Sequence, residues 1–285
     1  MKVLSAGFIN WDIILETAEI PQEDMSSEIN AEYKKPGGSA TNTALTLNSL
    51  GVNSVLTGSI GTDNAATKIK NILDTQNLSY YVQENENTSK IYSLITDSKD
   101  PRYLYTEDSI GQFSTDIVPE DVWNTITHLH ITSFDKTISN KFVKKASENN
   151  ISISFNPNHK FTNIEFPFIV EHSDVIILND TEHKTLSDRY NMSSLTENTT
   201  VVITHGSNGC SAYENDSKTT HSGFEADVVD TVGAGDSFIS GFLTQWLNGA
   251  KLYTCLKYGN AVAATSVQTR GSPNNIDKET LKNFL

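Results

Sequence analysis

A glycine-rich turn followed by a carboxylate is the stretch of this chain whose chemistry can be stated most directly. The turn consists of Gly233, Ala234 and Gly235 and has no bulky side chain, so its backbone N–H groups can approach a ligand closely. At the start of a helix such N–H groups bind an anion, and a phosphoryl group is the anion we expect. Asp236 then has two interpretations. It satisfies unpaired N–H groups at the helix start, or it is a general base that takes a proton from a hydroxyl group.

The residues around this turn predict the elements that position it. Residues 227–248 are typical of a short strand, the turn and then an amphipathic helix. Six apolar residues recur on one face of that helix: Phe238, Ile239, Phe242, Leu243, Trp246 and Leu247. Gly249 is the expected end of the helix. Asp236 would therefore lie in the first turn of the helix, beside the anion site.

The literal string Asp230–Asp236, DTVGAGD, resembles the C-terminal signature of the ribokinase-like (PfkB) family of carbohydrate and nucleoside kinases. In that family the final Asp is the catalytic base, and the amides of the Gly-Ala-Gly turn form the anion hole. The resemblance implies these roles for Asp236 and for the three residues before it. It also places Thr231 in the nucleotide site. Seven positions in register make this a specific motif.

A second glycine-rich segment, residues 36–44 (PGGSATNTA), precedes another predicted helix. It resembles the N-terminal signature of the family, whose glycines and Asn line the sugar site, and the matching positions are Gly37, Gly38 and Asn42. Asp12 follows the first predicted strand. It either forms a local turn or, by the same resemblance, binds sugar hydroxyls. Ribokinases proper often have Lys at the position of Ser39, which leaves ribose itself open as the acceptor.

Further motifs point to a nucleotide and a metal. Asn179 and Glu182 match an N-x-x-E motif that acts through Mg²⁺ and the phosphate water network, although the same spacing is also an ordinary helix start. Thr204, Gly206 and Gly209 match a segment that contacts nucleotide phosphates, or else form a glycine turn between two strands. The resemblance places Asn260 beside the adenine, with a packing helix as the alternative. ATP and Mg²⁺ are the implied cofactors.

Two segments depart from the family pattern or extend it. The usual D-P-N-x-R sequence reads N-P-N-H-K here, so that Asn156 replaces an Asp and Lys160 replaces an Arg. Asn156 keeps the shape of Asp without its charge, and Lys160 keeps the charge without the guanidinium group. Residues 269–272 resemble part of a monovalent-cation site, which adds K⁺ to the implied cofactors.

Alternating strands and helices are typical of a parallel sheet covered by helices on both faces. The resemblance extends over 1–285 as one domain, a ribokinase-like three-layer α/β/α sandwich with a mostly parallel central sheet and a small β-lid. Insertions at about 13–35 and 80–113 would form the lid, since their short alternating runs suit small antiparallel strands. A homodimer through the lid is what the resemblance suggests. His128 and His130 share one face of a strand, and we interpret them as structural.

Composition excludes several classes of partner. With 35 acidic and 21 basic residues the formal net charge is -14, which disfavours nucleic acid and anionic membranes as partners. The two cysteines lie far apart and indicate neither a zinc site nor a disulfide framework. No signal peptide or membrane-spanning run is evident, so we expect a cytoplasmic protein. No Walker, protein-kinase or Rossmann motif competes with the interpretation above.

The sequence therefore predicts a kinase that transfers the γ-phosphoryl group of Mg-ATP to a hydroxymethyl-type hydroxyl of a small sugar. A nucleoside kinase of the same family is the alternative, with Trp11, Tyr103 and Tyr105 as candidates for contacts with the base. A non-catalytic regulator that binds sugar or nucleotide is the other alternative. A phosphorylated-sugar acceptor needs a cationic pocket and is less favoured, because only four cations lie near the expected lid: Lys34, Lys35, Lys90 and Arg102.

Overall fold

The computed structural model describes residues 1–96, 102–106, 113–132, 135–157, 167–215, 217–269 and 276–285. Its helices are α1 (Ser39–Ser49), α2 (Asn64–Thr75), α3 (Glu120–Trp123), α4 (Lys136–Glu148), α5 (Pro167–Glu171), α6 (Asp180–Ser187), α7 (Met192–Thr196), α8 (Ala234–Trp246), α9 (Leu252–Ser266) and α10 (Lys278–Lys282). Nine strands form the main sheet: β1 (Lys2–Ala6), β4 (Asn53–Ile60), β5 (Ser79–Glu84), β8 (His128–Thr132), β9 (Ser152–Asn156), β10 (Val175–Asn179), β11 (Thr200–Thr204), β12 (Cys210–Glu214) and β13 (Ser217–His221). The lid strands are β2 (Asn10–Thr17), β3 (Ile29–Gly37), β6 (Lys90–Ile95) and β7 (Arg102–Tyr105).

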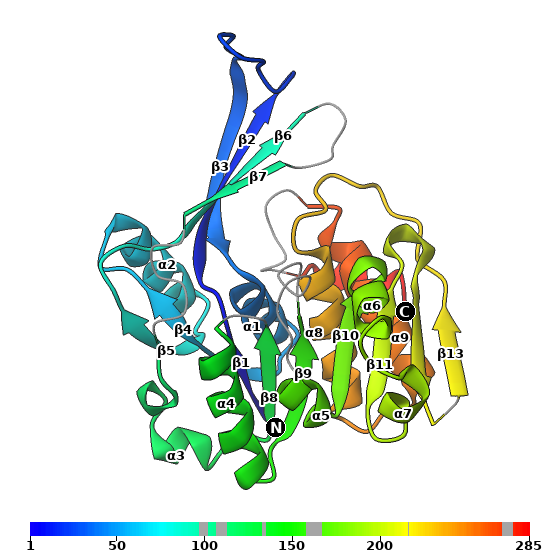
Figure 1. Ribbon diagram of the computed structural model, residues 1–285. Coiled ribbons are helices and arrows are strands. Elements are labelled where there is room, and N and C mark those ends of the chain that lie inside the picture. Colours follow the sequence, from blue (N-terminus) through cyan, green and yellow to red (C-terminus); the bar gives the residue numbers. More distant parts are fainter. Residues whose placement is uncertain (97–101, 107–112, 133–134, 158–166, 216, 270–275) are drawn as a thin grey trace.

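The main sheet has the order β13-β12-β11-β10-β9-β8-β1-β4-β5. From β11 to β5 the neighbouring strands are parallel, and β12 and β13 continue the sheet as antiparallel strands. The strands β8, β9 and β10 point toward the lid (Figure 1). In open parallel sheets ligands bind at this carboxyl edge, so the topology predicts where the site lies. The expected α/β/α sandwich is confirmed.

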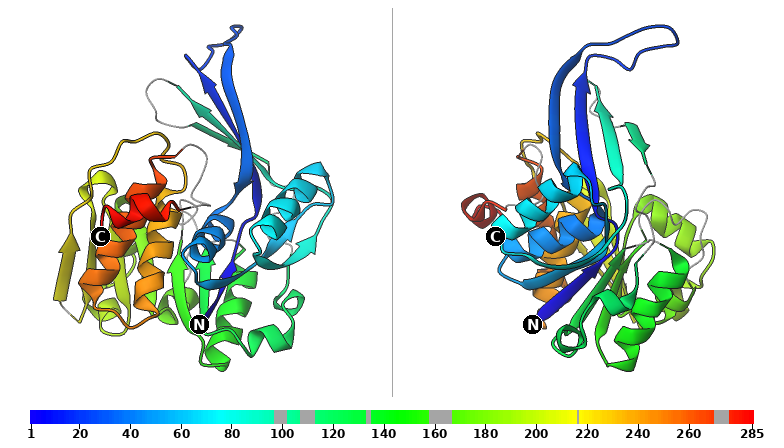
Figure 2. Two further views of the ribbon diagram at one scale, coloured as in Figure 1. Left: turned by 180° about the vertical axis from the view of Figure 1, so that it is seen from behind. Right: turned by 90° about the vertical axis from the view of Figure 1, so that its left-hand side faces the viewer.

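Helices cover both faces of the sheet because its strands are apolar on both sides. Along β10, Ile176 and Leu178 pack with helices α3 to α6, whereas Val175 and Ile177 pack with α8 and α9. The two helical layers lie on opposite faces of the sheet in Figures 1 and 2. The predicted apolar face of α8 is confirmed, since Phe238, Ile239, Phe242 and Leu243 are buried in this second cluster and Trp246 and Leu247 pack against it. This packing fixes α8 and therefore the turn at its start.

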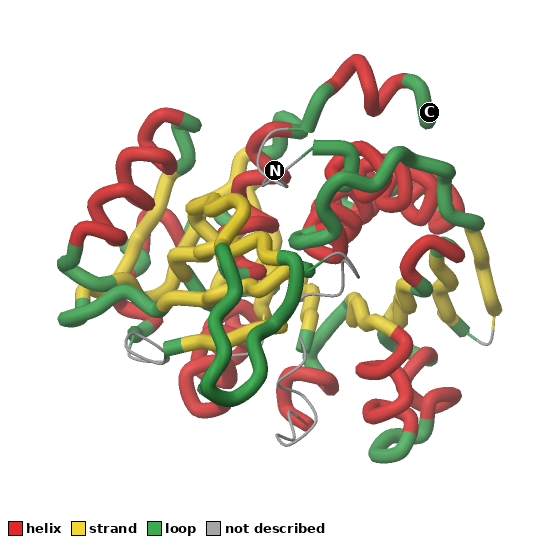
Figure 3. Tube along the Cα trace, turned by 90° about the horizontal axis from the view of Figure 1, so that it is seen from above, coloured by secondary structure: helices red, strands yellow, loops and turns green. Residues whose placement is uncertain are grey.

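The lid is a four-stranded sheet in the order β3-β2-β6-β7. It rises over the part of the body that contains α1 and α2, with α8 and α9 beside it (Figures 1 and 3). The expectation of antiparallel lid strands holds for β2–β3 and β6–β7, but β2 and β6 pair in parallel. Within the second predicted insertion, β5 pairs with β4 in the main sheet, so the lid strand of that insertion begins at Lys90.

One predicted strand is absent, because residues 227–230 before the glycine-rich turn form no regular element. Instead the N–H groups of Val229 and Asp230 both donate to the carbonyl of Val267 after α9. The side chains of Val228 and Val229 are exposed, so the apolar residues that suggested a buried strand bury little surface. This segment is a loop held against the C-terminal end of α9.

Two buried histidines form a neutral polar network inside the sheet. The Oγ of Ser154 lies 2.7 Å from His128 Nε2 and 2.8 Å from His130 Nδ1, and Ser152 Oγ lies 2.7 Å from His128 Nδ1. Burial lowers the pKa of each histidine to about 3, and in His128 the neighbouring His130 lowers it further. Both rings face Ser154 and no group of three or more His, Cys, Asp or Glu able to hold a metal occurs among the described residues, in keeping with a structural role.

This network predicts acid destabilisation. In the unfolded chain a histidine has a pKa of about 6.5, so below that pH the unfolded state binds protons that the folded state cannot bind. The contribution of the two histidines to the free energy of unfolding should therefore be constant above about pH 7 and fall as the pH drops toward 4, by up to about 1.4 kcal/mol per unit for each histidine. Urea titrations between pH 8 and 4.5 measure it.

Buried carboxyl groups change the free energy of unfolding with pH in the opposite sense to the histidines. The histidine contribution is therefore measured by comparing matched variants. His130→Met should remove the contribution of one histidine to the dependence of the free energy of unfolding on pH. His172→Gln changes an exposed histidine and should leave that dependence unchanged. An identical slope in His130→Met and the unmodified chain would contradict the assignment.

No helix in the described parts of the chain is long and apolar enough to cross a membrane. Cys210 and Cys255 are both buried free thiols.

Candidate active site

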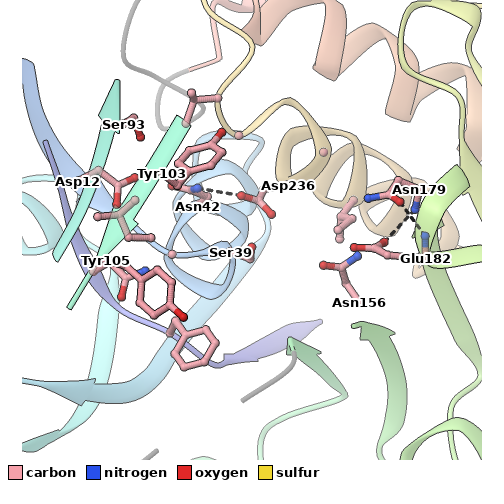
Figure 4. A pocket seen from close by; sticks show the side chains of 18 of the residues that line it. Asp12, Ser39, Asn42, Ser93, Tyr103, Tyr105, Asn156, Asn179, Glu182 and Asp236 are labelled. Atoms are coloured by element: carbon pink, nitrogen blue, oxygen red, sulfur yellow. Dashed lines mark hydrogen bonds between the residues drawn. The ribbon is translucent and has the colours of Figure 1, made fainter. Parts of the chain in front are cut away.

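A pocket of about 450 Å³ lies between the lid and the carboxyl edge of the main sheet. The lid contributes Asp12, Ile91, Ser93, Tyr103, Tyr105 and Thr106. The body contributes a larger set that includes Asn42, Asn156, Asn179, Glu182, Thr204 and Asp236. The close view in Figure 4 shows the lid residues on one side, Asn156, Asn179 and Glu182 on the other, and Asp236 between them. The pocket thus brings together motifs that lie more than two hundred residues apart in the sequence.

Asp236 lies in the first turn of α8 and is tied to α1. Its Oδ2 accepts a hydrogen bond of 2.8 Å from Asn42 Nδ2, and it is also hydrogen-bonded to the side chain of Ser39. Burial raises the pKa of Asp236 to about 6, while the bonds from Asn42 and Ser39 and the charge of Lys35 lower it. A carboxylate with this pKa is largely ionised at neutral pH and is still basic enough to take a proton.

The backbone before Asp236 has the shape expected of an anion site. Gly233 has a φ of 84° and is the N-cap of α8, a left-handed conformation that favours glycine. The N–H of Ala234 donates to Thr231 O, so that amide is already used. The N–H groups of Gly235 and Asp236 belong to the first helical turn, where no intrahelical acceptor exists. Gly233 and Gly235 line the pocket, so this end of the helix can receive an anion.

Asp12 faces the pocket from the lid strand β2 and is 6% exposed. Its Oδ1 has no hydrogen-bond partner within the described ranges. Burial raises the pKa of Asp12 to about 7, the positive charge of Lys35 lowers it, and the negative charge of Asp236 raises it. A Cβ on Gly37 would lie 2.0 Å from Asp12 Oδ2, so only glycine leaves room for this carboxylate.

Position 38 requires glycine for a different steric reason. Its φ is 93°, and a Cβ there would lie 2.2 Å from the carbonyl oxygen of Phe8. This contact lets α1 begin directly against the loop that follows β1, so that Asn42 on α1 can reach Asp236. The glycine pair therefore serves both carboxylates, one glycine by making room for Asp12 and the other by positioning Asn42.

Asn179 and Glu182 form a capping box at the start of α6. The side chain of Asn179 accepts from the N–H of Glu182, and Glu182 Oε2 accepts from the N–H of Asn179, each at 2.9 Å. Both residues also line the pocket, and Figure 4 shows these bonds. Burial raises the pKa of Glu182, and the charge of Asp236 raises it further. The alternative interpretation as a helix start is thus correct, and it leaves the other oxygen, Oε1, outside the capping box.

These residues fit a magnesium site that is built mainly from water and phosphate oxygens. The described residues contain no group of three or more protein carboxylates, histidines or cysteines that could bind a metal directly. Mg²⁺ often retains water and binds through one or two carboxylates plus substrate phosphates. One buried carboxylate beside a predicted phosphate site is consistent with that chemistry.

The pfkB carbohydrate kinase family matches residues 1–279 of the chain. The chain belongs to the PfkB family. An ATP-dependent ribose-1-phosphate kinase of Halopiger xanaduensis is 28% identical over 100% of this chain and 98% of that protein. A nucleoside kinase of Methanocaldococcus jannaschii is 29% identical over 96% of this chain and 93% of its own length. The crystal structure of the M. jannaschii nucleoside kinase, an archaeal member of the ribokinase family, superposes with a TM-score of 0.84 and 25% identity over 99% of this chain and 98% of that one.

On the nucleotide side of this PfkB kinase, only one predicted residue lines the pocket. Thr204, at the end of β11, lines it and donates to Leu178 O. Gly206 and Gly209 form the next turn, and a Cβ on Gly209 would lie 2.1 Å from His221 O. Asn260 Nδ2 donates to the carbonyl oxygens of His221 and Ser222, which ties α9 to the end of β13. Thr231 is exposed outside the pocket, and these nucleotide contacts stay predictions.

Of the departures from the family pattern, the structure explains the one at Asn156. Asn156 lines the pocket, and its Nδ2 donates to Ile177 O at 2.8 Å. An ionised Asp could not donate this bond, so the amide joins β9 to β10 in a way that the usual carboxylate would not. Lys160 and residues 270–272 lie outside the described residues.

Sequence reasoning missed two residues of this PfkB kinase that bear on the carboxylates and misplaced one aromatic residue. Ser39 is a partner of Asp236, and Lys35 is buried on the lid strand β3. Trp11, a candidate for contacts with a base, is 7% exposed in the core between α1, α2 and β4 and does not line the pocket. Tyr103 and Tyr105 do line it. The alternation of side chains along β2 could have corrected the prediction for Trp11. Consecutive residues of a strand point to opposite faces, so Trp11 must point away from the face that Asp12 occupies.

Proposed function

We propose that this kinase transfers the γ-phosphoryl group of ATP to the hydroxymethyl oxygen of a ribofuranosyl acceptor that carries a substituent at C1. The observation that carries the proposal is the placement of two carboxylates in one pocket, the buried Asp12 from the lid and the half-buried Asp236 from the start of α8. A ribosyl unit offers ring hydroxyls to the first and a hydroxymethyl group to the second. The relatives named as a ribose-1-phosphate kinase and a nucleoside kinase favour ribosyl acceptors that differ at C1.

Asp236 acts as the base in this proposal. Its carboxylate takes the proton of the acceptor hydroxyl as the oxygen attacks the γ-phosphorus, and ADP leaves on the opposite side. Asn42 and Ser39 hold the carboxylate in place through the bonds described above. The N–H groups at the start of α8 stabilise the charge on the transferred phosphoryl group.

The nucleotide would lie between this helix and the ends of β10 and β11. Thr204 and the turn of Gly206 and Gly209 are the proposed phosphate contacts, and Asn260 and Thr231 complete the nucleotide site. Asn179 and Glu182 would hold Mg²⁺ through water, and the ion supplies charge neutralisation for the phosphates. Because Glu182 has one carboxylate oxygen outside the capping box, it can accept hydrogen bonds from such water molecules.

The lid would close over the acceptor and exclude water. Tyr103 and Tyr105 line the pocket although they are 55% and 59% exposed, so their rings are available to cover an acceptor. Exclusion of water limits the wasteful hydrolysis of ATP. We also propose that the lid forms a homodimer contact, supported by the exposed apolar side chains of Ile29 on β3 and Leu104 on β7. A role for K⁺ rests on the resemblance of residues 269–272 alone, and the cytoplasm stays the proposed location.

Release of ADP from Mg-ATP with a panel of acceptors tests the proposal. The panel contains ribose, ribose 1-phosphate, purine and pyrimidine nucleosides, and fructose, and the position of the new phosphate is read by NMR. We expect turnover of one class of C1-substituted ribosides, with the phosphate on the hydroxymethyl carbon. Turnover of fructose alone would contradict the acceptor class. Binding of ATP and a riboside without turnover would contradict the kinase and favour a regulator.

A further inference from the structure

Two neighbouring lysines on the lid strand β3 have opposite environments. Lys34 is exposed and forms an ion pair with Glu32. Lys35 is 6% exposed, and its Nζ has no hydrogen-bond partner within the described parts of the chain. Successive side chains of a strand point to opposite faces, so Lys34 faces solvent and Lys35 faces the protein interior. A buried and unpaired ammonium group is costly and calls for a functional explanation.

Carboxylates surround Lys35. The register of β2 and β3 places Lys35 opposite Asp12. Burial lowers the pKa of Lys35 below its ordinary value, and the charges of Asp12, Asp230 and Asp236 oppose this shift by raising the pKa. Three carboxylates around one amine favour its protonated form, so we take Lys35 to be charged.

The other ionisable groups at the site carry no positive charge. Glu182 on α6 and the phenol of Tyr103 on β7 are the remaining titratable groups that these carboxylates influence, the first through Asp236 and the second through Asp12 and Asp230. Within the described ranges, no lysine or arginine lines the pocket. Among the described residues, Lys35 is the cation whose charge lowers the pKa of both Asp12 and Asp236.

We propose that Lys35 is a positioning residue that acts through Asp12 and Asp236, because its buried ammonium group is the counter-charge that lets both carboxylates be ionised in one small pocket. The inference rests on the proposed function, in which Asp236 accepts a proton and Asp12 accepts hydrogen bonds from acceptor hydroxyls. Two carboxylates that share a site repel each other, and one of them otherwise retains its proton. The positive charge of Lys35 stabilises the ionised form of each carboxyl group and so lowers the pKa of both.

Lys35 acts indirectly in this proposal. It does not line the pocket, and its Nζ is covered by protein. An acceptor bound beside Asp12 would therefore feel the charge of Lys35 without touching it. The Oδ1 of Asp12 is covered by protein as well and has no hydrogen-bond partner among the described residues, so Lys35 forms no direct bond with that oxygen.

The test compares Lys35→Met with Lys35→Arg and with the matched control Lys34→Met. For each variant, kcat and KM for the acceptor and for Mg-ATP are measured between pH 5.5 and 9. We expect Lys35→Met to lower kcat/KM for the acceptor about 10–100-fold at pH 7 and to shift its acid limb upward by one to two pH units, since one unit corresponds to a factor of ten. Activity should recover toward pH 9, Lys35→Arg should restore the limb, and Lys34→Met should behave as the unmodified enzyme.

Two outcomes would overturn the proposal. An equal loss at every pH in Lys35→Met would show a structural role only. A loss confined to acceptors that carry a phosphate would show that Lys35 binds the acceptor directly. Lys35→Gln serves as the second variant if Lys35→Met does not fold.

A readout without turnover separates this inference from the proposed function. NMR titration of the Asp12 and Asp236 carboxyl carbons should show both titrations at higher pH in Lys35→Met than in the unmodified chain. If the acceptor panel gives no turnover but these titrations shift, the kinase proposal fails and the role of Lys35 stands. Unchanged titrations contradict the role of Lys35 whatever the activity.

Discussion

Asp236→Asn should lower kcat about 10²–10⁴-fold, the range by which a positioned general base accelerates a reaction. Asn keeps the size of Asp, and its side-chain oxygen can still accept the hydrogen bond from Asn42. The substitution therefore removes the basic group and little else. Single-turnover measurements of phosphoryl transfer, together with KM for both substrates, distinguish loss of chemistry from loss of binding.

Stability provides the control for Asp236→Asn. The pKa of Asp236 is raised to about 6 by burial, so above that pH the folded state holds a carboxylate that it disfavours relative to the unfolded chain. Removal of the charge should leave the melting temperature at pH 8 unchanged or raise it. Glu148→Gln removes a charge from an exposed pair with Lys144 and should change neither property. Activity of Asp236→Asn within tenfold of the unmodified enzyme would rule out Asp236 as the base.

The regular elements of this fold could largely be predicted from sequence patterns. The strand predicted to contain His128 and His130 is β8, and the amphipathic helix predicted after the glycine-rich turn is α8. Both segments have strong periodicity. Val228 and Val229 also favoured a strand, but the conformation of residues 227–230 is set by hydrogen bonds to Val267, which is distant in sequence. Local patterns carry no information about such a partner.

The site residues likewise divide into those that local sequence patterns identify and those whose role depends on residues distant in sequence. The glycine-rich turn identified Asp236, and its position after the first predicted strand identified Asp12, because both signals are local in the sequence. Lys35 was noted only as one of several cations near the lid, since neither its burial nor its place opposite Asp12 on the paired strand can be read from the local sequence. The phosphorylated-sugar acceptor was less favoured for want of a cationic pocket. A relative named as a ribose-1-phosphate kinase now makes ribose 1-phosphate part of the acceptor panel.

Asp12→Asn should lower kcat/KM for the acceptor about 10²-fold or more while leaving KM for Mg-ATP within about twofold. Hydrogen bonds to a charged group contribute about 1.5–3 kcal/mol each, and the buried carboxylate of Asp12 is the proposed partner of the acceptor hydroxyls. Asn keeps one acceptor oxygen but adds an N–H₂ group that cannot accept a bond. Most of the loss should appear in KM, measured by ADP release at saturating ATP.

Glu32→Gln is the matched control, since it removes a carboxylate from the exposed side of the lid and should leave acceptor binding unchanged. Equal losses in Asp12→Asn and Glu32→Gln would refute specific recognition by Asp12. The pH profile adds an independent check of the charge balance at the site. Removal of Asp12 takes a negative charge away from Asp236, so the acid limb of kcat should move to lower pH, whereas Lys35→Met moves it to higher pH. Opposite shifts in the two variants would show that the titration of Asp236 responds both to the negative charge of Asp12 and to the positive charge of Lys35, which a purely structural role for Lys35 does not produce.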